Sequence, residues 1–325
     1  MTLSRRRFLQ VAAGVAVVPI VSGTASAQNY PSRPIRFIVP FPSGGVSDII
    51  ARYMAQKLSD RLGQSFVIEN RGGAGSNLGT EIVVNAPPDG YTLLLDGSAN
   101  AVNATLYPNL SFNYLRDISP VCSLFRAPHI MEVHPSFPAR TVPEFIAYAN
   151  AHPGQINMGS AGTGTISHMA GELFKMMSGI ELTHVPYRGA APALTDLLGG
   201  HVQVMFDNAA SSTEHVRGGR LHALAATTAK RMDVLPGVPT VGEFVRGYEA
   251  SNVNGIGMPA KTPPEIVAKL NTEVAAILGD SPTKARFAQL GGAAMIGSPA
   301  DYRTFLAEET EKWAKVVKAA GLKPD

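Results

Sequence analysis

Nine residues, Pro40 to Asp48, join a short apolar strand to an amphipathic helix, and they constrain the fold more than any other segment. Before them, 35–39 alternates as a strand does, and two prolines and two glycines then forbid its continuation. After them, apolar residues recur every four positions from Ile50 to Leu62. The turn therefore lies at a helix N-terminus, where backbone N–H groups lack intrahelical partners and carry partial positive charge. Such a turn can bind a carboxylate or phosphate without a basic side chain, although similar glycine turns also serve purely structural purposes.

The first 27 residues have the pattern of an export signal. Three arginines at 5–7 precede Phe-Leu, an apolar run covers 11–21, and the small residues at 25–27 are typical of a cleavage site. These features predict a twin-arginine signal peptide that is cut before Gln28. An apolar run of about eleven residues is too short to anchor a protein in a bilayer. We therefore expect a mature protein in the periplasm.

The positive charge of the chain comes from this leader. The chain holds 28 basic and 25 acidic residues, and the leader contributes three arginines and no acid, so the mature chain has no formal net charge. This balance gives no support for binding nucleic acid or an anionic membrane. Cys122 is the single cysteine, so no internal disulfide is possible. The eight histidines show no metal-binding spacing, and we expect neither a metal nor a cofactor.

Short β-rich runs alternate with helical stretches along most of the mature chain, which predicts an α/β fold with largely parallel sheets. The expected strands are 35–39, 66–69, 91–95, 156–159, 182–185, 202–206 and 221–227. The expected helices are 48–62, 78–86, 142–151, 166–177, 191–198, 264–278 and 300–319. Trp313, in the last of these, is expected in the core.

Two segments without a helical period, 120–138 and 248–258, are candidates for crossings between two lobes. With these crossings, the C-terminal helices would return to the first lobe. We therefore expect lobe 1 to comprise 28–127 and 251–325, and lobe 2 to comprise 128–250.

Three glycine-rich turns follow predicted strands, at 40–48, 70–77 and 160–165. Ligands of open α/β sheets bind beyond the C-terminal ends of the strands. Two of the turns belong to the first expected lobe and one to the second. Their convergence on one cleft would be a stronger sign of a ligand site than any single turn.

Six motifs carry a family resemblance. They are Pro40-Phe41-Pro42-Ser43-Gly44-Gly45 with Asp48, Glu69-Asn70-Arg71 with Gly73-Ala74-Gly75, Pro88-Asp89-Gly90-Tyr91-Thr92-Leu93, Ser160-Ala161-Gly162-Thr163-Gly164-Thr165 with His168, His184-Val185-Pro186-Tyr187-Arg188-Gly189, and Met205-Phe206-Asp207-Asn208. In this order the chain resembles the tripartite tricarboxylate transporter substrate-binding family, also called the Bug receptors. The resemblance implies a type II-like periplasmic binding protein, a monomer with two α/β lobes and a ligand cleft between them. It also implies that the protein captures a small mono- or dicarboxylate, delivers it to a tripartite tricarboxylate-type membrane permease, and is not an enzyme.

In that family, backbone amides and ordered waters hold the ligand carboxylate, with few or no arginines. Carried over to this chain, the resemblance implies ligand contacts at Phe41, Ser43, Gly44, Gly45, Ser98, Ser160, Gly162, Thr163, Thr165 and Asp207. The chain departs from the common pattern at Asn100, where relatives often continue the turn with Gly or Thr. The role of Asn100, and the ligand choice on that side of the cleft, are therefore open.

Several of these polar residues have a structural alternative. Asp48 is a candidate ligand residue that could pair with a ligand ammonium, or it could cap the following helix. Thr163 and Thr165 offer hydroxyl groups to a ligand, or stabilise the turn and cap the next helix. Asp207 ends a predicted strand and faces the cleft or serves as a cap, and His168 is expected to be a structural hydrogen-bonding residue.

An exported oxidoreductase or hydrolase is the alternative from another class. Gly73, Gly75 and Gly79 resemble a variant dinucleotide fingerprint, but Asp96 is the only nearby acid that could bind a ribose. Ser98 and Ser160 lie near glycines but not in Gly-x-Ser-x-Gly. A receptor that reports to a membrane sensor is a second alternative. Neither the identity of the carboxylate nor the partner permease follows from the sequence.

Overall fold

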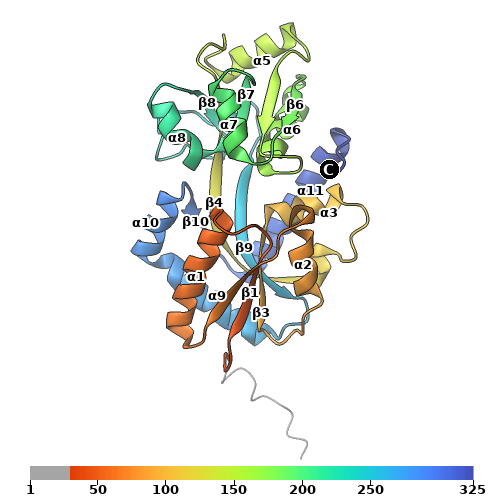
Figure 1. The fold of residues 1–325 in the computed structure, drawn as a ribbon, viewed down its shortest axis with the longest axis vertical. Helices are drawn as coiled ribbons and strands as arrows, with labels where there is room; N and C mark the ends of the chain where they lie inside the picture. Colours follow the sequence, from red (N-terminus) through yellow and green to blue (C-terminus); the bar gives the residue numbers. More distant parts are fainter. Residues whose placement is uncertain (1–29, 325) are drawn as a thin grey trace, which may run out of the picture. The chain divides into compact units, whose positions relative to one another are not determined.

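A computed structural model describes residues 30–324, so the predicted leader at 1–27 lies outside the described residues. In the first lobe, β1 (Ile35–Val39) lies between β2 (Phe66–Asn70) and β3 (Thr92–Gly97), and both neighbours are parallel to it. Helices α1 (Val46–Leu62) and α2 (Asn77–Val84) connect these strands (Figure 1). This is the strand, helix, strand order that the sequence predicts.

The second lobe has a smaller sheet of the same kind. Its parallel strands are β5 (Asn157–Ser160), β6 (Thr183–Pro186) and β7 (Val204–Asn208), with β5 in the centre. Its helices are α5 (Val142–Ala151), α6 (Ile166–Ser178), α7 (Ala190–Leu198) and α8 (Ala209–Arg217), and β8 (His222–Ala226) completes the sheet. The 3-10 turn η2 (Val241–Glu243) follows β8 along the chain.

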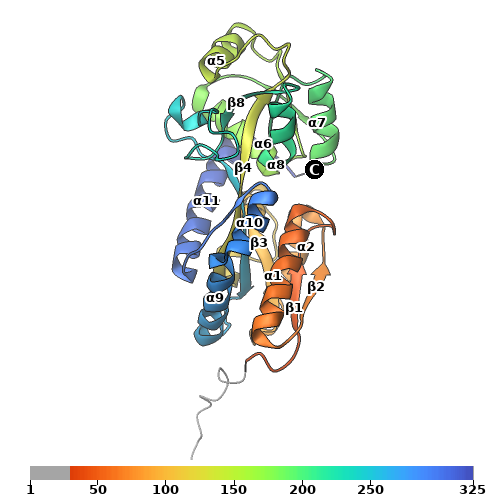
Figure 2. The same ribbon diagram turned by 90° about the vertical axis from the view of Figure 1, so that its left-hand side faces the viewer.

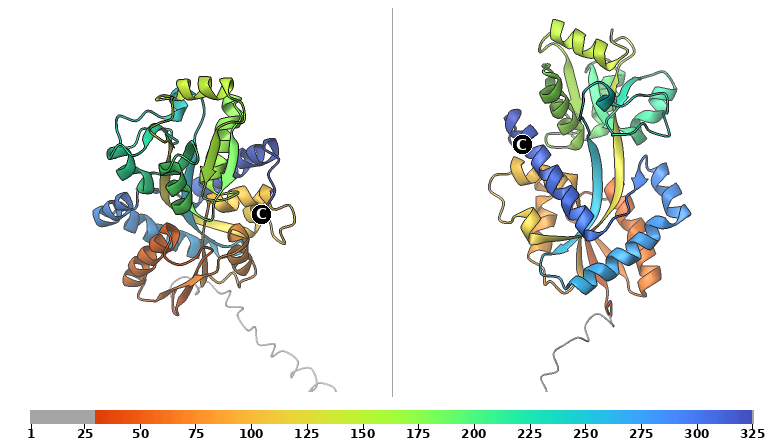
Figure 3. Two further views of the ribbon diagram at one scale, coloured as in Figure 1. Left: turned by 45° about the horizontal axis from the view of Figure 1, so that its top comes forward. Right: turned by 180° about the vertical axis from the view of Figure 1, so that it is seen from behind.

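Two long strands, β4 (Ile118–Val133) and β9 (Ser251–Pro259), connect the lobes, as Figures 1 and 3 show. β4 pairs antiparallel with β9 over 118–128, and beyond that point with β7 and β8. The sheets are therefore mixed, and the expectation of largely parallel sheets holds only away from these crossing strands. The lobe boundaries at 127/128 and 250/251 stay predictions; they fall where β4 changes its partner and where β9 begins.

The C-terminal segment returns to the first lobe. It contains α9 (Pro264–Gly279), α10 (Ser281–Gln289), the two-residue strand β10 (Ala293–Ala294) and α11 (Pro299–Ala319). β10 pairs with β4, and α9 packs against α1. Figure 2 shows α9 beside the first-lobe strands and α11 running from there toward the second lobe.

Four helices of the structure were missing from the sequence-based prediction: α3 (Ser98–Leu106), α4 (Tyr114–Asp117), α8 and α10. The turn η1 (Ala74–Ser76) was also missing. The segment of α3 contains serine, threonine and two asparagines, which are poor helix formers, and it shows no clear apolar period. Packing against α11 stabilises this helix instead.

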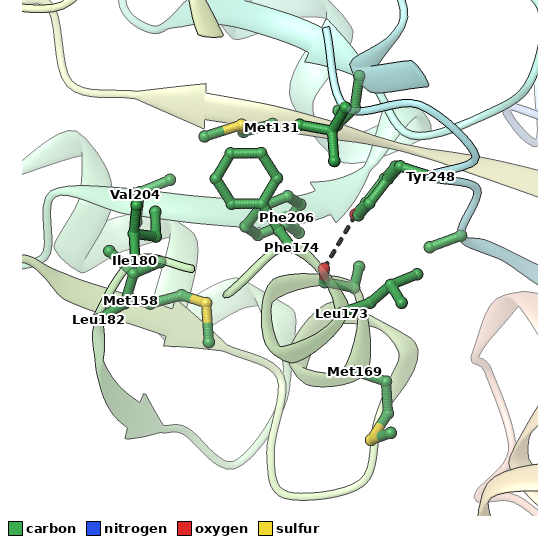
Figure 4. Packing of buried hydrophobic residues seen from close by; sticks show 14 of the residues in the cluster. Met131, Met158, Met169, Leu173, Phe174, Ile180, Leu182, Val204, Phe206 and Tyr248 are labelled. Carbon is green, nitrogen blue, oxygen red and sulfur yellow. Dashed lines mark hydrogen bonds between the residues drawn. The ribbon is translucent and has the colours of Figure 1, made fainter. Parts of the chain in front are cut away.

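The largest apolar core lies in the second lobe and extends to α3 and α11. Phe174 of α6 packs against Phe206 of β7 and Tyr248, with ring centroids 5.7 and 6.1 Å apart. The Tyr248 hydroxyl donates to the carbonyl of Ala170 at 2.9 Å (Figure 4). Trp313 is completely buried in the same core, as the sequence predicts. None of the helices within residues 30–324 has both the length and the apolar character needed to cross a membrane.

Candidate functional site

A cavity of about 250 Å³ lies where loops of both lobes and the crossing strands meet. It is lined by Phe41, Ser47, Asp96, Gly97, Ser98, Ala99, Asn100, His129, Ala161, Gly164, Thr165, Ile166, Ser167, Ala190, Asp207, Asn208, Asn252 and Asn254. Four residues that the sequence predicts to contact ligand are among them: Phe41, Ser98, Thr165 and Asp207. The other predicted residues are not: Ser43, Gly44, Gly45, Asp48, Ser160, Gly162 and Thr163. The turns at 40–48 and 160–165 therefore contribute to one cavity, whereas the turn at 70–77 does not.

Five helices begin at this cavity. Ser47 lies in the first turn of α1, Ser98 begins α3, Thr165 is the N-cap of α6, Ala190 begins α7, and Asn208 is the N-cap of α8. Among the described residues that line the cavity there is no lysine or arginine. The partial positive charge that this cavity offers to an anion therefore comes from backbone N–H groups at helix ends.

Asp48 stabilises the first turn instead of lining the cavity. Its carboxylate accepts hydrogen bonds of 2.9 Å from the Gly44 N–H, the Arg52 guanidinium and the Asn70 amide. Burial opposes ionisation, but these hydrogen bonds outweigh it and keep the pKa of Asp48 below its ordinary value. The N-cap of α1 is Gly45, so Asp48 bonds the turn from inside the helix and is not itself the cap.

The positive φ in this turn belongs to Gly44, at +89°, and not to Gly45, which has φ of −75°. Gly45 therefore needs no glycine-specific backbone conformation. A Cβ at Gly45 would lie 4.0 Å from the nearest atom, the carbonyl oxygen of Pro42. A Cβ at this position consequently makes only an ordinary van der Waals contact.

The turn at 160–165 is held by its own hydroxyl groups. The Ser160 hydroxyl lies 2.7 Å from His184 Nε2 and accepts from the Gly162 N–H, while Ser160 is completely buried. The Thr165 hydroxyl donates to the Gly162 carbonyl at 2.7 Å and accepts from the His168 N–H, so Thr165 caps α6. The capping alternative for Thr165 is thus realised in a residue that also lines the cavity.

His168 has the structural role expected for it. Its Nδ1 accepts from the Gly164 N–H at 3.2 Å, and its ring stacks on that of His184 with centroids 3.6 Å apart. Its Nε2 lies 3.5 Å from Oε1 of Glu172, which also pairs with Lys175. These contacts connect the turn to the body of α6.

Ser98 and Asn100 line the cavity with side chains that are already bonded. The Ser98 hydroxyl accepts from the Val253 N–H at 2.9 Å. Oδ1 of Asn100 accepts from the Gly97 N–H at 3.1 Å, and its Nδ2 donates to Thr80 at 2.8 Å. Asn100 therefore fixes the turn between β3 and α3, which gives this departure from the family pattern a structural role.

Asp207 lies at the end of β7 and belongs to a buried acidic pair. The Ser212 hydroxyl donates to Glu132 at 2.7 Å and to Asp207 at 3.2 Å, and Ser211 donates to Asp207 at 2.5 Å. Burial, and then the nearby Asp207, raise the pKa of Glu132 well above its ordinary value. Burial also raises the pKa of Asp207. Burial and the neighbouring carboxylate therefore both favour the protonated form of Glu132, and Asp207 is the member of the pair that lines the cavity.

The lining residues that sequence reasoning did not predict include three with an unpartnered polar atom: His129 of β4, Ser167 of α6 and Asn254 of β9. Each is buried, and each has a polar atom without a hydrogen-bond partner in the described part of the chain. Ser167 could have been found, because it lies two residues beyond the predicted glycine loop at 160–165. Nothing in the sequence indicates that His129 and Asn254 face the cavity, since this depends on strand register.

The features that suggested an enzyme have structural roles. Ser160 and His184 form a hydrogen-bonded pair of the kind that activates a nucleophile, but Ser160 is completely buried and does not line the cavity. The two carboxylate oxygens of Asp96 accept hydrogen bonds from the hydroxyl groups of Tyr114 and Tyr302. The Asp96 carboxylate is therefore bonded within the protein and is not positioned to bind a ribose. No group of three histidine, cysteine, aspartate or glutamate residues within 30–324 could hold a metal ion.

The comparisons with known proteins agree with one another. A family model described as tripartite tricarboxylate transporter family receptor matches residues 50–322. Protein BugT of Bordetella pertussis is 37% identical over 320 residues, which cover 95% of this chain and 98% of BugT.

Solved structures match over nearly the same length. R. palustris Rpa4515 with adipate is 38% identical with a TM-score of 0.79, and the match covers 91% of this chain and 100% of that one. MatC of Rhodopseudomonas palustris with bound malate is 31% identical with a TM-score of 0.75, and the match covers 89% of this chain and 100% of that one. The two-lobed fold of this chain is thus that of periplasmic binding proteins.

Proposed function

This chain belongs to the tripartite tricarboxylate transporter receptor family, and we propose that it is a periplasmic receptor for a small mono- or dicarboxylate. The observation that carries the proposal is the convergence of five helix N-termini on a cavity whose lining, within residues 30–324, includes no lysine or arginine. Neutral N–H donors at helix ends stabilise an anion, and each is already oriented before the ligand arrives. Two similar solved structures, Rpa4515 with adipate and MatC with bound malate, support a carboxylate as the ligand.

In this proposal the first contacts are made by the turns at 40–48 and 160–165, together with Ser98 and Asp207. Residues of these turns that do not line the cavity, such as Gly45 and Thr163, would reach the ligand when the lobes close. Closure by a hinge motion of β4 and β9 buries the ligand and produces the surface that a permease recognises.

We also propose how the receptor is exported, in which oligomeric state it acts and to which partner it delivers its ligand. The receptor is exported by the twin-arginine route, acts as a monomer, catalyses no reaction and delivers its ligand to a tripartite tricarboxylate-type permease. Family membership supports the permease as partner, because the family is defined by receptors of such transporters. The arginine pattern at 5–7 supports the export route.

A thermal-shift screen tests the ligand class. We expect a carboxylate of about three to eight carbons to raise the melting temperature, because a ligand at one hundred times its Kd adds about 2.7 kcal/mol to the free energy of unfolding. The matching amide should not do so. Gentle denaturation of the purified protein should release a co-purified acid, which mass spectrometry would identify. A screen in which sugars or cationic amino acids bind but no carboxylate does would contradict the proposed function.

A further inference from the structure

Three polar side chains in the cavity wall each have an atom without a hydrogen-bond partner within residues 30–324. They indicate which group the ligand has in addition to its carboxylate. His129 is 5% exposed, Ser167 is 4% exposed and Asn254 is 3% exposed. The atoms Nδ1 of His129, Oγ of Ser167 and Oδ1 of Asn254 have no hydrogen-bond partner in residues 30–324. They belong to β4, α6 and β9, so they come from three different elements around one cavity.

The other polar residues of the cavity wall show that a polar atom without a hydrogen-bond partner is unusual there. Ser98, Asn100 and Thr165 also line the cavity, and each uses its polar atoms within the protein. Buried polar groups in native proteins are almost always hydrogen-bonded, because an unpaired group loses its bonds to water without compensation. Of the eight buried side-chain atoms without a partner in residues 30–324, three belong to residues that line this one cavity, and these three are the ones that a ligand in the cavity can reach.

The types of atom restrict the ligand. Oδ1 of Asn254 is an amide oxygen and can only accept a hydrogen bond. The amide is oriented so that its Nδ2 donates to the Ser47 hydroxyl at 3.4 Å. A ligand carboxylate cannot donate to Oδ1. Ser167 lies in the first turn of α6, where its hydroxyl can donate to a carboxylate that is held at the helix end.

The charged groups that line the cavity restrict the chemical class of the ligand further. Asp96 and Asp207 line the cavity, and no lysine or arginine does among the described residues. Burial lowers the pKa of His129 to about 4, so its imidazole is neutral at pH 7. No lysine or arginine among these lining residues can pair with a second ligand carboxylate, and an ionised aspartate has no proton to donate to it, whereas a ligand hydroxyl group can donate to the acceptors present. An ammonium group would be opposed by the five helix N-termini.

We propose that the ligand is a hydroxy-monocarboxylate, whose hydroxyl group bonds to Asn254 and His129 and whose carboxylate accepts from Ser167. This inference rests on the proposed function and specifies its ligand. A hydroxyl group both donates and accepts, so it can donate to Oδ1 of Asn254 and bond to Nδ1 of His129 whichever ring nitrogen carries the proton.

The test is a calorimetric series with ligands of equal carbon number, from three to six carbons. Each set contains the unsubstituted acid, the 2-hydroxy and ω-hydroxy acids, the dicarboxylic acid and the ω-amino acid. We expect a hydroxy acid to bind at least tenfold more tightly than the unsubstituted acid and the dicarboxylate of the same length. The inference is wrong if a dicarboxylate or an amino acid binds most tightly.

Two variants test the assigned contacts. Asn254→Ala should lower the affinity for the hydroxy acid at least tenfold and leave that for the unsubstituted acid nearly unchanged. Ser167→Ala should lower both affinities by the same factor, because it acts on the carboxylate. Ser123→Ala is the matched control, since Ser123 is also buried but donates to the Met295 carbonyl away from the cavity.

The outcomes separate this inference from the proposed function. Binding of dicarboxylates alone, or an equal loss for all acids in Asn254→Ala, overturns the hydroxy-acid inference and leaves the carboxylate receptor intact. Binding of no acid in any set overturns both. Circular dichroism of each variant establishes that a loss of affinity does not come from unfolding.

Discussion

The hydroxyl of Tyr302 in α11 donates a hydrogen bond of 2.8 Å to Oδ1 of Asp96, at the end of β3 and 206 positions earlier in the chain. Tyr114 donates to Oδ2 of the same carboxylate at 2.9 Å. All three side chains are buried. The last helix is therefore bonded to the central sheet of the first lobe, directly beside the ligand cavity.

Replacing Tyr302 by phenylalanine should destabilise the protein by about 1–3 kcal/mol, because Oδ1 of Asp96 loses its donor in a buried site. The ring that packs against Gly255 is retained. Urea unfolding measures the change. Tyr53→Phe is the control, since its hydroxyl bonds to Thr283 at 3.0 Å in a partly buried site, and we expect a smaller loss there. Equal losses in the two variants would contradict a special role for the Asp96 contact.

Asp96 should also make stability depend on pH. Burial raises its pKa to about 7 from an ordinary value of 3.8, against the hydrogen bonds from Tyr302 and Tyr114. Between these pH values the folded protein binds more protons at this site than the unfolded chain does, so its contribution to stability falls as pH rises from about 4 to 7. Asp96→Asn removes that contribution. The free energy of unfolding of the variant, minus that of the wild type, should therefore increase over this range, and parallel curves would contradict the assignment.

His129 changes the stability with pH in the opposite direction to Asp96, which provides an internal check. Burial lowers its pKa to about 4 from 6.5, so the unfolded chain binds more protons between these values and stability rises with pH there. His129→Gln should remove this rise. In the wild type the two contributions partly cancel, and the two variants separate them.

The elements that the sequence predicted best are those with a local signal. The strand at 35–39 and the helix at 142–151 have the predicted bounds, because an alternating or helical apolar pattern and clear end signals coincide there. The helix at 98–106 has no such pattern and depends on packing against α11, a contact between distant parts of the chain.

The same distinction holds for the candidate site. The turns that supply Phe41 and Thr165 follow from glycine, proline and hydroxyl residues at strand ends, and both residues line the cavity. His129 and Asn254 face it because of the pairing register of β4 and β9, which no local pattern specifies. The turn at 70–77 was expected in the cleft, but it does not line the cavity.

Export by the twin-arginine route predicts that replacing Arg5, Arg6 and Arg7 together by lysine leaves the precursor in the cytoplasm. The charge of the leader is unchanged, so the experiment tests the arginine side chains themselves. Cell fractionation followed by immunoblotting gives the result. Normal delivery of the triple variant to the periplasm would favour the general secretory route.

Gly164→Ala should weaken ligand binding by displacing the turn at 160–165, because Gly164 lines the cavity. Gly164 has φ of +76°, and a Cβ there would lie 2.6 Å from Cδ2 of Leu106 in α3, so either the Leu106 side chain or the turn must shift. We expect at least a tenfold loss of affinity. Gly154→Ala is a close control, because φ is +71° and nothing lies within 4 Å of the added atom. The control should lose about 1–2 kcal/mol of stability but little affinity, and equal affinities in both variants would contradict the prediction.

The two glycine turns of the first lobe allow backbone and side-chain binding of the anion to be compared. Gly45 precedes α1, and a Cβ there makes only an ordinary van der Waals contact within the protein, so Gly45→Val should fold normally. A branched side chain would nevertheless obstruct a carboxylate that approaches the helix end. Affinity should fall at least tenfold, which corresponds to about 1.4 kcal/mol.

Arg71→Ala should have little effect, because the Arg71 guanidinium pairs with Glu69 at 3.3 Å, is 54% exposed and does not line the cavity. Both variants are titrated with the same identified acid in a calorimeter, after circular dichroism has established that their folds are unchanged. If Arg71→Ala abolished binding while Gly45→Val left it intact, a salt bridge to Arg71 would replace the N-terminus of α1 as the group that holds the carboxylate.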